Sequence, residues 1–168
     1  MFDMNEIVWI EASGQQLGLL PARGGAVAAW TCQHQGQEVP LWCHGSSPSL
    51  GQLPSFPMLP WVNRISGGGF THRGQHWPVP LNRKAEPWPI HGDAWLQAWT
   101  LQQPHTGVAV MRLQSHHHGG NPYAYEAMQR FELTSSGLRQ QLAVTHRGDL
   151  VPSPTPANHR QPAGRRET

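Results

Sequence analysis

Polar side chains and aromatic rings that could bind a small polyol are concentrated between residues 56 and 99. Asn63, Arg64, His91 and Asp93 lie in this stretch together with several tryptophans. A polyol needs fixed donors and acceptors for its hydroxyl groups and a flat apolar surface for its ring. The residue types therefore favour a carbohydrate ligand. Two plainer interpretations stay open, because Arg64 could form a surface ion pair and His91 could be a hydrogen-bonded structural histidine.

The same stretch has the composition of loops. Gly and Pro are abundant in the chain, at 18 and 16 residues, and both residues favour turns over long helices. Residues 44–60 and 82–95 are especially rich in such turn formers. Functional side chains often lie on loops that a rigid sheet holds in place, so the flanking segments should be strands.

Strand-like alternation is clearest over residues 123–133, where every second residue from Tyr123 to Leu133 falls on one face. Residues 138–145 alternate in the same way after a turn at 135–137. The alanines within residues 26–32 weaken the strand prediction there, because alanine is depleted in strands. The other expected strands are residues 7–10, 17–21, 26–32, 38–42, 69–72, 75–79, 99–101 and 108–114. Short strands with closely spaced turns predict an all-β sandwich or barrel.

Charge and hydropathy exclude several classes of protein. The chain has 168 residues and a formal net charge of +2, which is too small a bias to indicate nucleic-acid binding. No apolar run approaches the length of a membrane span, and the first residues lack the pattern of a signal peptide. Cys32 and Cys43 are not in a metal-binding or redox motif. We therefore expect a cytoplasmic protein with reduced thiols, no membrane contact and no nucleic-acid partner.

Two other motifs are better explained as turns and loops than as cofactor sites. The glycines at 67–69 are not followed by the Lys-Ser/Thr of a phosphate-binding loop. The histidines at 116–118 are adjacent, and adjacent side chains on a strand point to opposite faces. We therefore expect no metal and no other cofactor.

The composition changes abruptly after Asp149. The remaining residues include four prolines and almost no apolar periodicity, so they cannot form a central strand. We expect residues 1–149 to form the folded part of the chain and residues 150–168 to be a disordered tail, which a frameshift near Asp149 or Leu150 would explain.

Several short motifs in order resemble the aldose 1-epimerase (galactose mutarotase) family. They are a Pro-Trp-Val-Asn-Arg-Ile segment ending at Ile65, a Gly-Gly-Phe hairpin start ending at Phe70, and Ile90-His91-Gly92 followed by tryptophans. Arg-Gly-Gly at 23–25 and the strand at 123–133 also fit the family, so the resemblance covers about residues 7–149. Each motif is modest alone, but their order and spacing are fairly specific.

The resemblance implies the N-terminal portion of a large antiparallel β-supersandwich. It implies an enzyme that interconverts the α and β anomers of free hexoses such as galactose or glucose, without a metal or nucleotide. Arg64 and His91 would hydrogen-bond the sugar, with His91 near the ring oxygen as the catalytic candidate, and Asn63 would support the same loop. The Asn-Arg-Ile form is similar to the free-aldose branch of the family rather than its sugar-phosphate branch.

Anomer interconversion needs one group that removes the anomeric proton and another that protonates the ring oxygen. The family supplies them as a second histidine and a C-terminal glutamate, with a substrate-binding aspartate between them, and none of the three has a match here. We therefore expect a truncated, weakly active or inactive member. The alternatives are a non-catalytic carbohydrate-binding module on the same fold, or a chain that does not fold stably. The sequence leaves the preferred sugar and the oligomeric state open.

Overall fold

The computed structural model describes residues 6–42 and 53–148. Within these ranges the chain is almost entirely β-structure, with two four-stranded antiparallel sheets and one two-stranded hairpin. Helical structure in the described residues is limited to single 3-10 turns such as η4 (Ala94–Leu96) and η5 (His118–Gly120). The predicted all-β fold is therefore confirmed.

The first sheet has the order β1-β2-β3-β4, and each strand pairs antiparallel with the next along the chain. The alanines of β3 are buried, so their burial against the core outweighs the weak strand propensity of alanine. β4 ends at Pro40, two residues earlier than expected, and the amides of Leu41 and Trp42 both donate to the Trp30 carbonyl. The strands are β1 (Val8–Ala12), β2 (Gln15–Leu20), β3 (Ala26–His34) and β4 (Gln37–Pro40).

The second sheet has the order β10-β9-β8-β7. Alternate residues of β9 from Tyr125 to Leu133 are buried, which confirms the predicted inward face. β7 is longer than the expected strand and includes Pro104, which an edge strand tolerates. The strands are β7 (Thr100–His105), β8 (Val108–His116), β9 (Ala124–Thr134) and β10 (Gly137–His146).

The hydrophobic core lies between the two sheets. Leu17, Leu19 and Val27 of the first sheet belong to the same buried cluster as Met111 and Phe131 of the second. The side-chain amide of Gln129 on β9 also donates to the Gly25 carbonyl, 2.8 Å away, and so ties the sheets together. The architecture is that of a β-sandwich.

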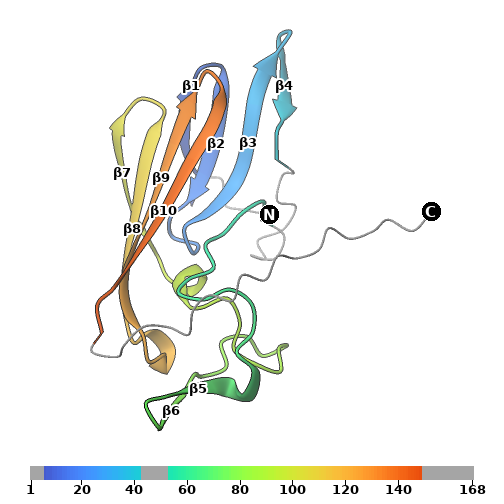
Figure 1. Cartoon of the computed structure of the whole chain (residues 1–168). Coiled ribbons are helices and arrows are strands. Elements are labelled where there is room, and N and C mark those ends of the chain that lie inside the picture. The colour runs from blue at the N-terminus through green and yellow to red at the C-terminus, as the bar shows by residue number, and fades with distance from the viewer. Residues whose placement is uncertain (1–5, 43–52, 149–168) are drawn as a thin grey trace, which may run out of the picture.

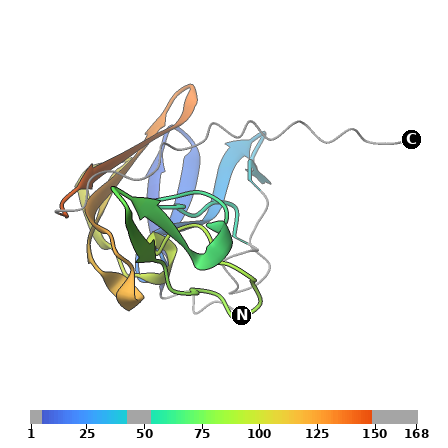
Figure 2. The ribbon, with the colours of Figure 1, turned by 60° about the horizontal axis from the view of Figure 1, so that its bottom comes forward.

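The third β-element lies at one end of the sandwich, where the long loops also run (Figure 1). It is the hairpin of β5 (Gly69–His72) and β6 (Gln75–Pro78), as predicted. The rotated view shows this hairpin crossing in front of the ends of both sheets (Figure 2). The loops between residues 53 and 99 are thus gathered at this end. The predicted disordered tail at 150–168 and Cys43 lie outside the described residues.

Candidate functional site

Two loop segments, one before the β5–β6 hairpin and one after it, form the candidate site. They are joined by isolated β-bridges, parallel between Leu59 and Gly92 and antiparallel between Arg64 and Ile90. The amide of Asp93 also donates to the Leu59 carbonyl at 2.8 Å. This pairing brings together the three residues predicted from sequence, Asn63, Arg64 and His91.

Glycine at position 92 is required by this pairing. Gly92 has φ +66°, in the left-handed region, and a Cβ atom there would lie 1.6 Å from the carbonyl oxygen of Leu59. The Arg-Gly-Gly motif has a similar explanation, because a Cβ on Gly24 would lie 2.2 Å from the carbonyl oxygen of Trp95. Both motifs therefore allow a close approach of two backbone segments.

His91 accepts a hydrogen bond on its Nδ1 atom from the amide of Asn63, at 3.0 Å. A neutral imidazole that accepts at Nδ1 carries its proton on Nε2. Burial and the nearby Arg64 guanidinium lower the pKa of His91 below its ordinary value of 6.5. Within the described part of the chain Nε2 has no partner, so His91 offers a neutral N–H donor at physiological pH.

Arg64 lies beside this histidine and is held by Glu86. Its Nε donates to Glu86 Oε2 at 2.7 Å, and its Nη1 lies 3.4 Å from Asn63 Oδ1. The Arg64 side chain is 45% exposed, whereas that of Glu86 is only 14% exposed. The guanidinium therefore remains accessible to a ligand, while its hydrogen bond to Glu86 fixes its orientation. The ion-pair interpretation of Arg64 is correct, and it is compatible with ligand binding.

Asn63 has φ +66°, and its side chain serves its own loop. Oδ1 accepts from the Arg64 amide at 2.9 Å, which is the local hydrogen bonding by which asparagine tolerates left-handed backbone. Asn63 thus supports the loop that carries Arg64, and its backbone contacts His91.

Aromatic rings surround His91. The ring of Phe56 meets the His91 imidazole edge to face, with centroids 6.2 Å apart, and lies 6.4 Å from the Trp95 ring. These contacts account for part of the burial that lowers the pKa of His91.

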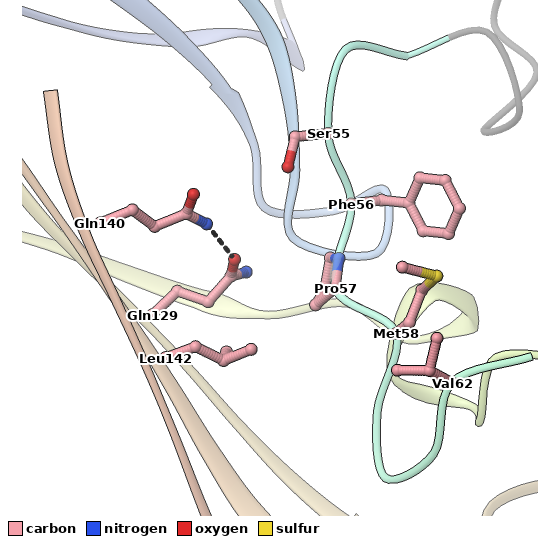
Figure 3. Close-up of a pocket in the computed structure, with 8 residues that line it drawn as sticks. All are labelled: Ser55, Phe56, Pro57, Met58, Val62, Gln129, Gln140 and Leu142. Atoms are coloured by element: carbon pink, nitrogen blue, oxygen red, sulfur yellow. Dashed lines mark hydrogen bonds between the residues drawn. The ribbon is translucent and has the colours of Figure 1, made fainter. Parts of the chain in front are cut away.

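A cavity of about 390 Å³ lies between the segment that contains Phe56 and the inner faces of β9 and β10. Figure 3 shows Gln129, Gln140 and Leu142 on one side of it and the segment from Ser55 to Val62 on the other. Gln140 donates to Gln129 at 3.2 Å. The cavity is thus mainly apolar with one amide pair. Its lining residues are Ser55, Phe56, Pro57, Met58, Val62, Gln129, Gln140 and Leu142.

Asp93 points away from this site into a buried polar network. It is 3% exposed, and its carboxylate accepts hydrogen bonds from the hydroxyl groups of Tyr125 and Ser115 and from the amide of Asn121. Burial nevertheless raises the pKa of Asp93 above its ordinary value of 3.8. We assign Asp93 a structural role, because these bonds tie the His91 loop to β8 and β9.

The described residues contain no group of three or more His, Cys, Asp or Glu side chains placed to hold a metal ion. In the same part of the chain, no helix has the length and apolar character needed to cross a bilayer.

Comparison with known proteins identifies the family. The model of the aldose 1-epimerase family matches residues 19–159. The chain belongs to the aldose 1-epimerase family. The match covers most of the chain, including every residue of the candidate site, and confirms the resemblance carried by the Asn-Arg-Ile and Ile-His-Gly motifs.

Two proteins of Escherichia coli (strain K12) are similar in sequence to this aldose 1-epimerase family member. The uncharacterized protein YphB is 32% identical over 93 residues, which cover 55% of this chain and 31% of YphB. The uncharacterized protein YihR is 26% identical over 99 residues, which cover 55% of this chain and 29% of YihR. The matched part thus amounts to less than one third of either relative.

Solved structures of the family show the same fold. A candidate aldose 1-epimerase from Escherichia coli K12 has a TM-score of 0.72 at 24% identity, over 84% of this chain and 46% of that protein. A galactose mutarotase-like protein from Lactobacillus casei ATCC 334 has a TM-score of 0.65 at 15% identity, over 83% of this chain and 44% of that protein. The chain spans less than half the length of these structures.

Glu86 and Asn82 are site residues that the sequence reasoning did not single out. A signal for Glu86 was present, because Glu86 and Asp93 are the only acidic residues between 53 and 99 and so the only carboxylates in that window with which Arg64 could pair. Asn82 gave no signal, because its hydrogen bonds are to the backbone of residues 90 and 92 in the same irregular loop, and such loop contacts follow no sequence periodicity.

Proposed function

We propose that this chain binds a free hexose such as galactose or glucose at His91 and Arg64, and that this site serves the interconversion of α and β anomers. The observation that carries the proposal is the hydrogen bond from the Asn63 amide to His91 Nδ1 at 3.0 Å. This bond leaves a neutral Nε2–H donor beside an accessible guanidinium, and both groups suit the oxygen atoms of a sugar. A cytoplasmic location remains part of the proposal.

The roles follow from the chemistry of ring opening. As the bond between the anomeric carbon and the ring oxygen breaks, negative charge develops on that oxygen. The Nε2–H of His91 can donate to the ring oxygen or a neighbouring hydroxyl group, and Arg64 can stabilise the developing charge. His91 is thus the catalytic candidate, Arg64 binds substrate, and Asn63 holds both in place. No metal or other cofactor enters this scheme.

A second candidate function is sugar binding without turnover. Anomer interconversion requires a base as well as an acid. Among the described site residues, the Glu86 carboxylate is bonded to Arg64 and that of Asp93 is buried in its own network. The described site therefore offers donors but no available carboxylate base, and this observation supports the binding module as the second candidate.

Polarimetry of fresh α-D-galactose and α-D-glucose tests the proposal. The chain is compared with an Arg64→Ala/His91→Ala double variant, and sugar binding is measured in parallel by titration calorimetry. Mutarotation faster than buffer that is lost in the variant supports catalysis. A rate equal to buffer with binding that is lost in the variant supports the binding module. If the folded chain shows no turnover and no sugar binding, the epimerase proposal and the binding-module alternative are both wrong.

A further inference from the structure

One side chain brackets His91 from both sides along the chain. Asn82 Nδ2 donates to the carbonyl oxygens of Ile90 and Gly92, at 2.7 Å each. Asn82 Oδ1 accepts from the amide of Ile90 at 2.9 Å. The three bonds fix the positions of Ile90 and Gly92 relative to each other. A hydrogen bond to His91 itself would not fix both of these neighbours.

The backbone of His91 needs such support. His91 has φ +61°, and the left-handed region costs a residue with a Cβ atom about 1–2 kcal/mol. Conformations of this kind persist only where the surroundings determine them. The His91 amide donates to the Asn63 carbonyl at 3.0 Å, and the indole N–H of Trp95 also donates to the Gly92 carbonyl at 2.9 Å. Among residues 6–42 and 53–148, Asn82 is the side chain that hydrogen-bonds to both neighbours of His91.

The polar groups of Asn82 serve its own loop. Both N–H groups of its amide are used, and its oxygen accepts from Ile90. The amide is half-buried, and a satisfied buried amide contributes rigidity rather than a free donor. We therefore expect its effect on a bound sugar to pass through the loop that carries His91.

We propose that Asn82 is a positioning residue of the sugar site, which fixes the direction of the His91 Nε2–H by clamping Ile90 and Gly92. Its role in sugar recognition rests on the function proposed above. Its effect on His91 itself does not, so the two can fail separately.

The first test reads the His91 ring directly. Nitrogen-15 NMR of the full chain reports the tautomer and the pKa of His91 in wild type, Asn82→Ala and Asn82→Asp. Asn82→Asp keeps the acceptor for the Ile90 amide but places a carboxylate against two carbonyl oxygens. We expect both variants to lose part of the Nε2–H tautomer preference. Asn82→Ala should also shift the pKa of His91 up towards 6.5, because the loop relaxes into water. In Asn82→Asp the new carboxylate raises this pKa by its charge as well, so only the tautomer is compared there.

A matched control separates this effect from general loss of packing. Gln15 is an amide side chain that is more buried than Asn82, at 7% exposed. It donates to the Thr134 carbonyl at 2.7 Å and accepts from Trp30, and it bonds to none of the site residues. Gln15→Glu and Gln15→Ala should lower the melting temperature without moving the His91 signals. Unchanged His91 signals in the folded Asn82 variants would overturn the proposal, as would equal changes in the Gln15 variants. Should Asn82→Ala not fold, the tautomer of His91 in Asn82→Asp decides the proposal, because the tautomer preference depends on the Asn63 amide at Nδ1.

The second test is a double-variant cycle on sugar affinity. Asn82→Asp is expected to weaken hexose binding by about tenfold, or about 1.4 kcal/mol. In a His91→Ala background the same change should have almost no further effect, because a positioning residue acts through the group it positions. Additive losses would show that Asn82 acts independently of His91. Absence of sugar binding in wild type would reject the proposed function, while the NMR test would still decide the clamp.

Discussion

Asn63 and His91, which lie 28 residues apart, exchange two hydrogen bonds of 3.0 Å. The Asn63 amide donates to His91 Nδ1, and the His91 amide donates to the Asn63 carbonyl. The first bond selects the ring tautomer and the second fixes the loop on which the ring stands. The chemistry of the site depends on this pair, because it makes His91 a donor rather than a base.

The tautomer is the first prediction. At neutral pH we expect the nitrogen-15 spectrum of His91 to show a neutral ring protonated on Nε2, with a pKa below 6.5. The reason is that burial disfavours the imidazolium and the Asn63 amide occupies Nδ1. His34 and His146, which lie on strands outside the site, serve as internal references. A ring protonated on Nδ1, or a pKa above 6.5, would contradict the geometry.

The second prediction is that removing either of two charges near His91 shifts the pKa of His91 in opposite directions. Arg64 lowers the pKa of His91 and Glu86 raises it. Arg64→Ala should therefore move the pKa of His91 up towards 6.5, and Glu86→Gln should move it further down. Arg83 also lowers this pKa, but less than Arg64 does, so Arg83→Ala should give a smaller upward shift. NMR titration of the three variants checks the order, and shifts of the same sign for Arg64 and Glu86 would refute it.

Asp93 leads to a prediction on stability and pH. Burial raises its pKa above 3.8, so the folded chain keeps the Asp93 proton over a pH range in which the unfolded chain has lost it. The contribution of Asp93 to the free energy of unfolding is therefore present below this range and is lost as the pH rises through the raised pKa. Urea denaturation at several pH values should show this downward term in wild type and not in Asp93→Asn.

Removing the acceptor altogether should cost more than removing the charge. Asp93→Ala leaves the donors of Tyr125, Ser115 and Asn121 without their acceptor, at about 1–3 kcal/mol for each buried group. Asp93→Asn keeps one acceptor oxygen and should be the milder change at any pH. The free energy of unfolding of wild type minus that of Asp93→Asn should fall as the pH rises. If this difference rises with pH instead, the raised pKa assigned to Asp93 is wrong.

The sequence predicted the sheets better than the details of the site. Period-two alternation along β9 is set by local burial, so it is visible in the sequence. The Asn-Arg-Ile and Ile-His-Gly motifs located the two site segments because their residue types are unusual. The partner of Arg64 lies on a second loop that meets the first only in the folded chain, and the clamp by Asn82 depends on the irregular path of the loop that carries His91. Such contacts leave no periodic pattern, so reading along the chain does not find them.

The direction of Asp93 shows the same limit. In the sequence it stands two residues after His91 among candidate ligand groups, and nothing local distinguishes it from them. The left-handed backbone at His91 and Gly92 turns the chain so that His91 lies beside Asn63 while Asp93 enters the core. Backbone geometry therefore decides which polar residue of the loop can bind a ligand.

Gly92 allows a sharp comparison with another glycine. Gly92 and Gly14 both have a left-handed φ, at +66° and +70°, but a Cβ on Gly92 would lie 1.6 Å from the Leu59 oxygen, whereas one on Gly14 would meet nothing within 4 Å. Gly14→Ala should lower the free energy of unfolding only by the cost of the left-handed backbone, about 1–2 kcal/mol. In Gly92→Ala the two site segments must also move apart. The free energy of unfolding should therefore fall several-fold more than in Gly14→Ala. Equal melting temperatures for the two variants would contradict the close approach.

The inner side of β10 gives the last prediction. Leu142 and Val144 are 49% and 44% exposed, and in the described part of the chain β10 is an edge of its sheet. An exposed apolar row on an edge strand promotes association. Leu142→Lys/Val144→Lys should reduce concentration-dependent self-association in sedimentation velocity. Gln141→Lys/Ala143→Lys adds the same charge on the opposite face and should reduce it less. If both double variants reduce association equally, net charge and not this face controls it. A monodisperse wild type would show that this face does not mediate self-association.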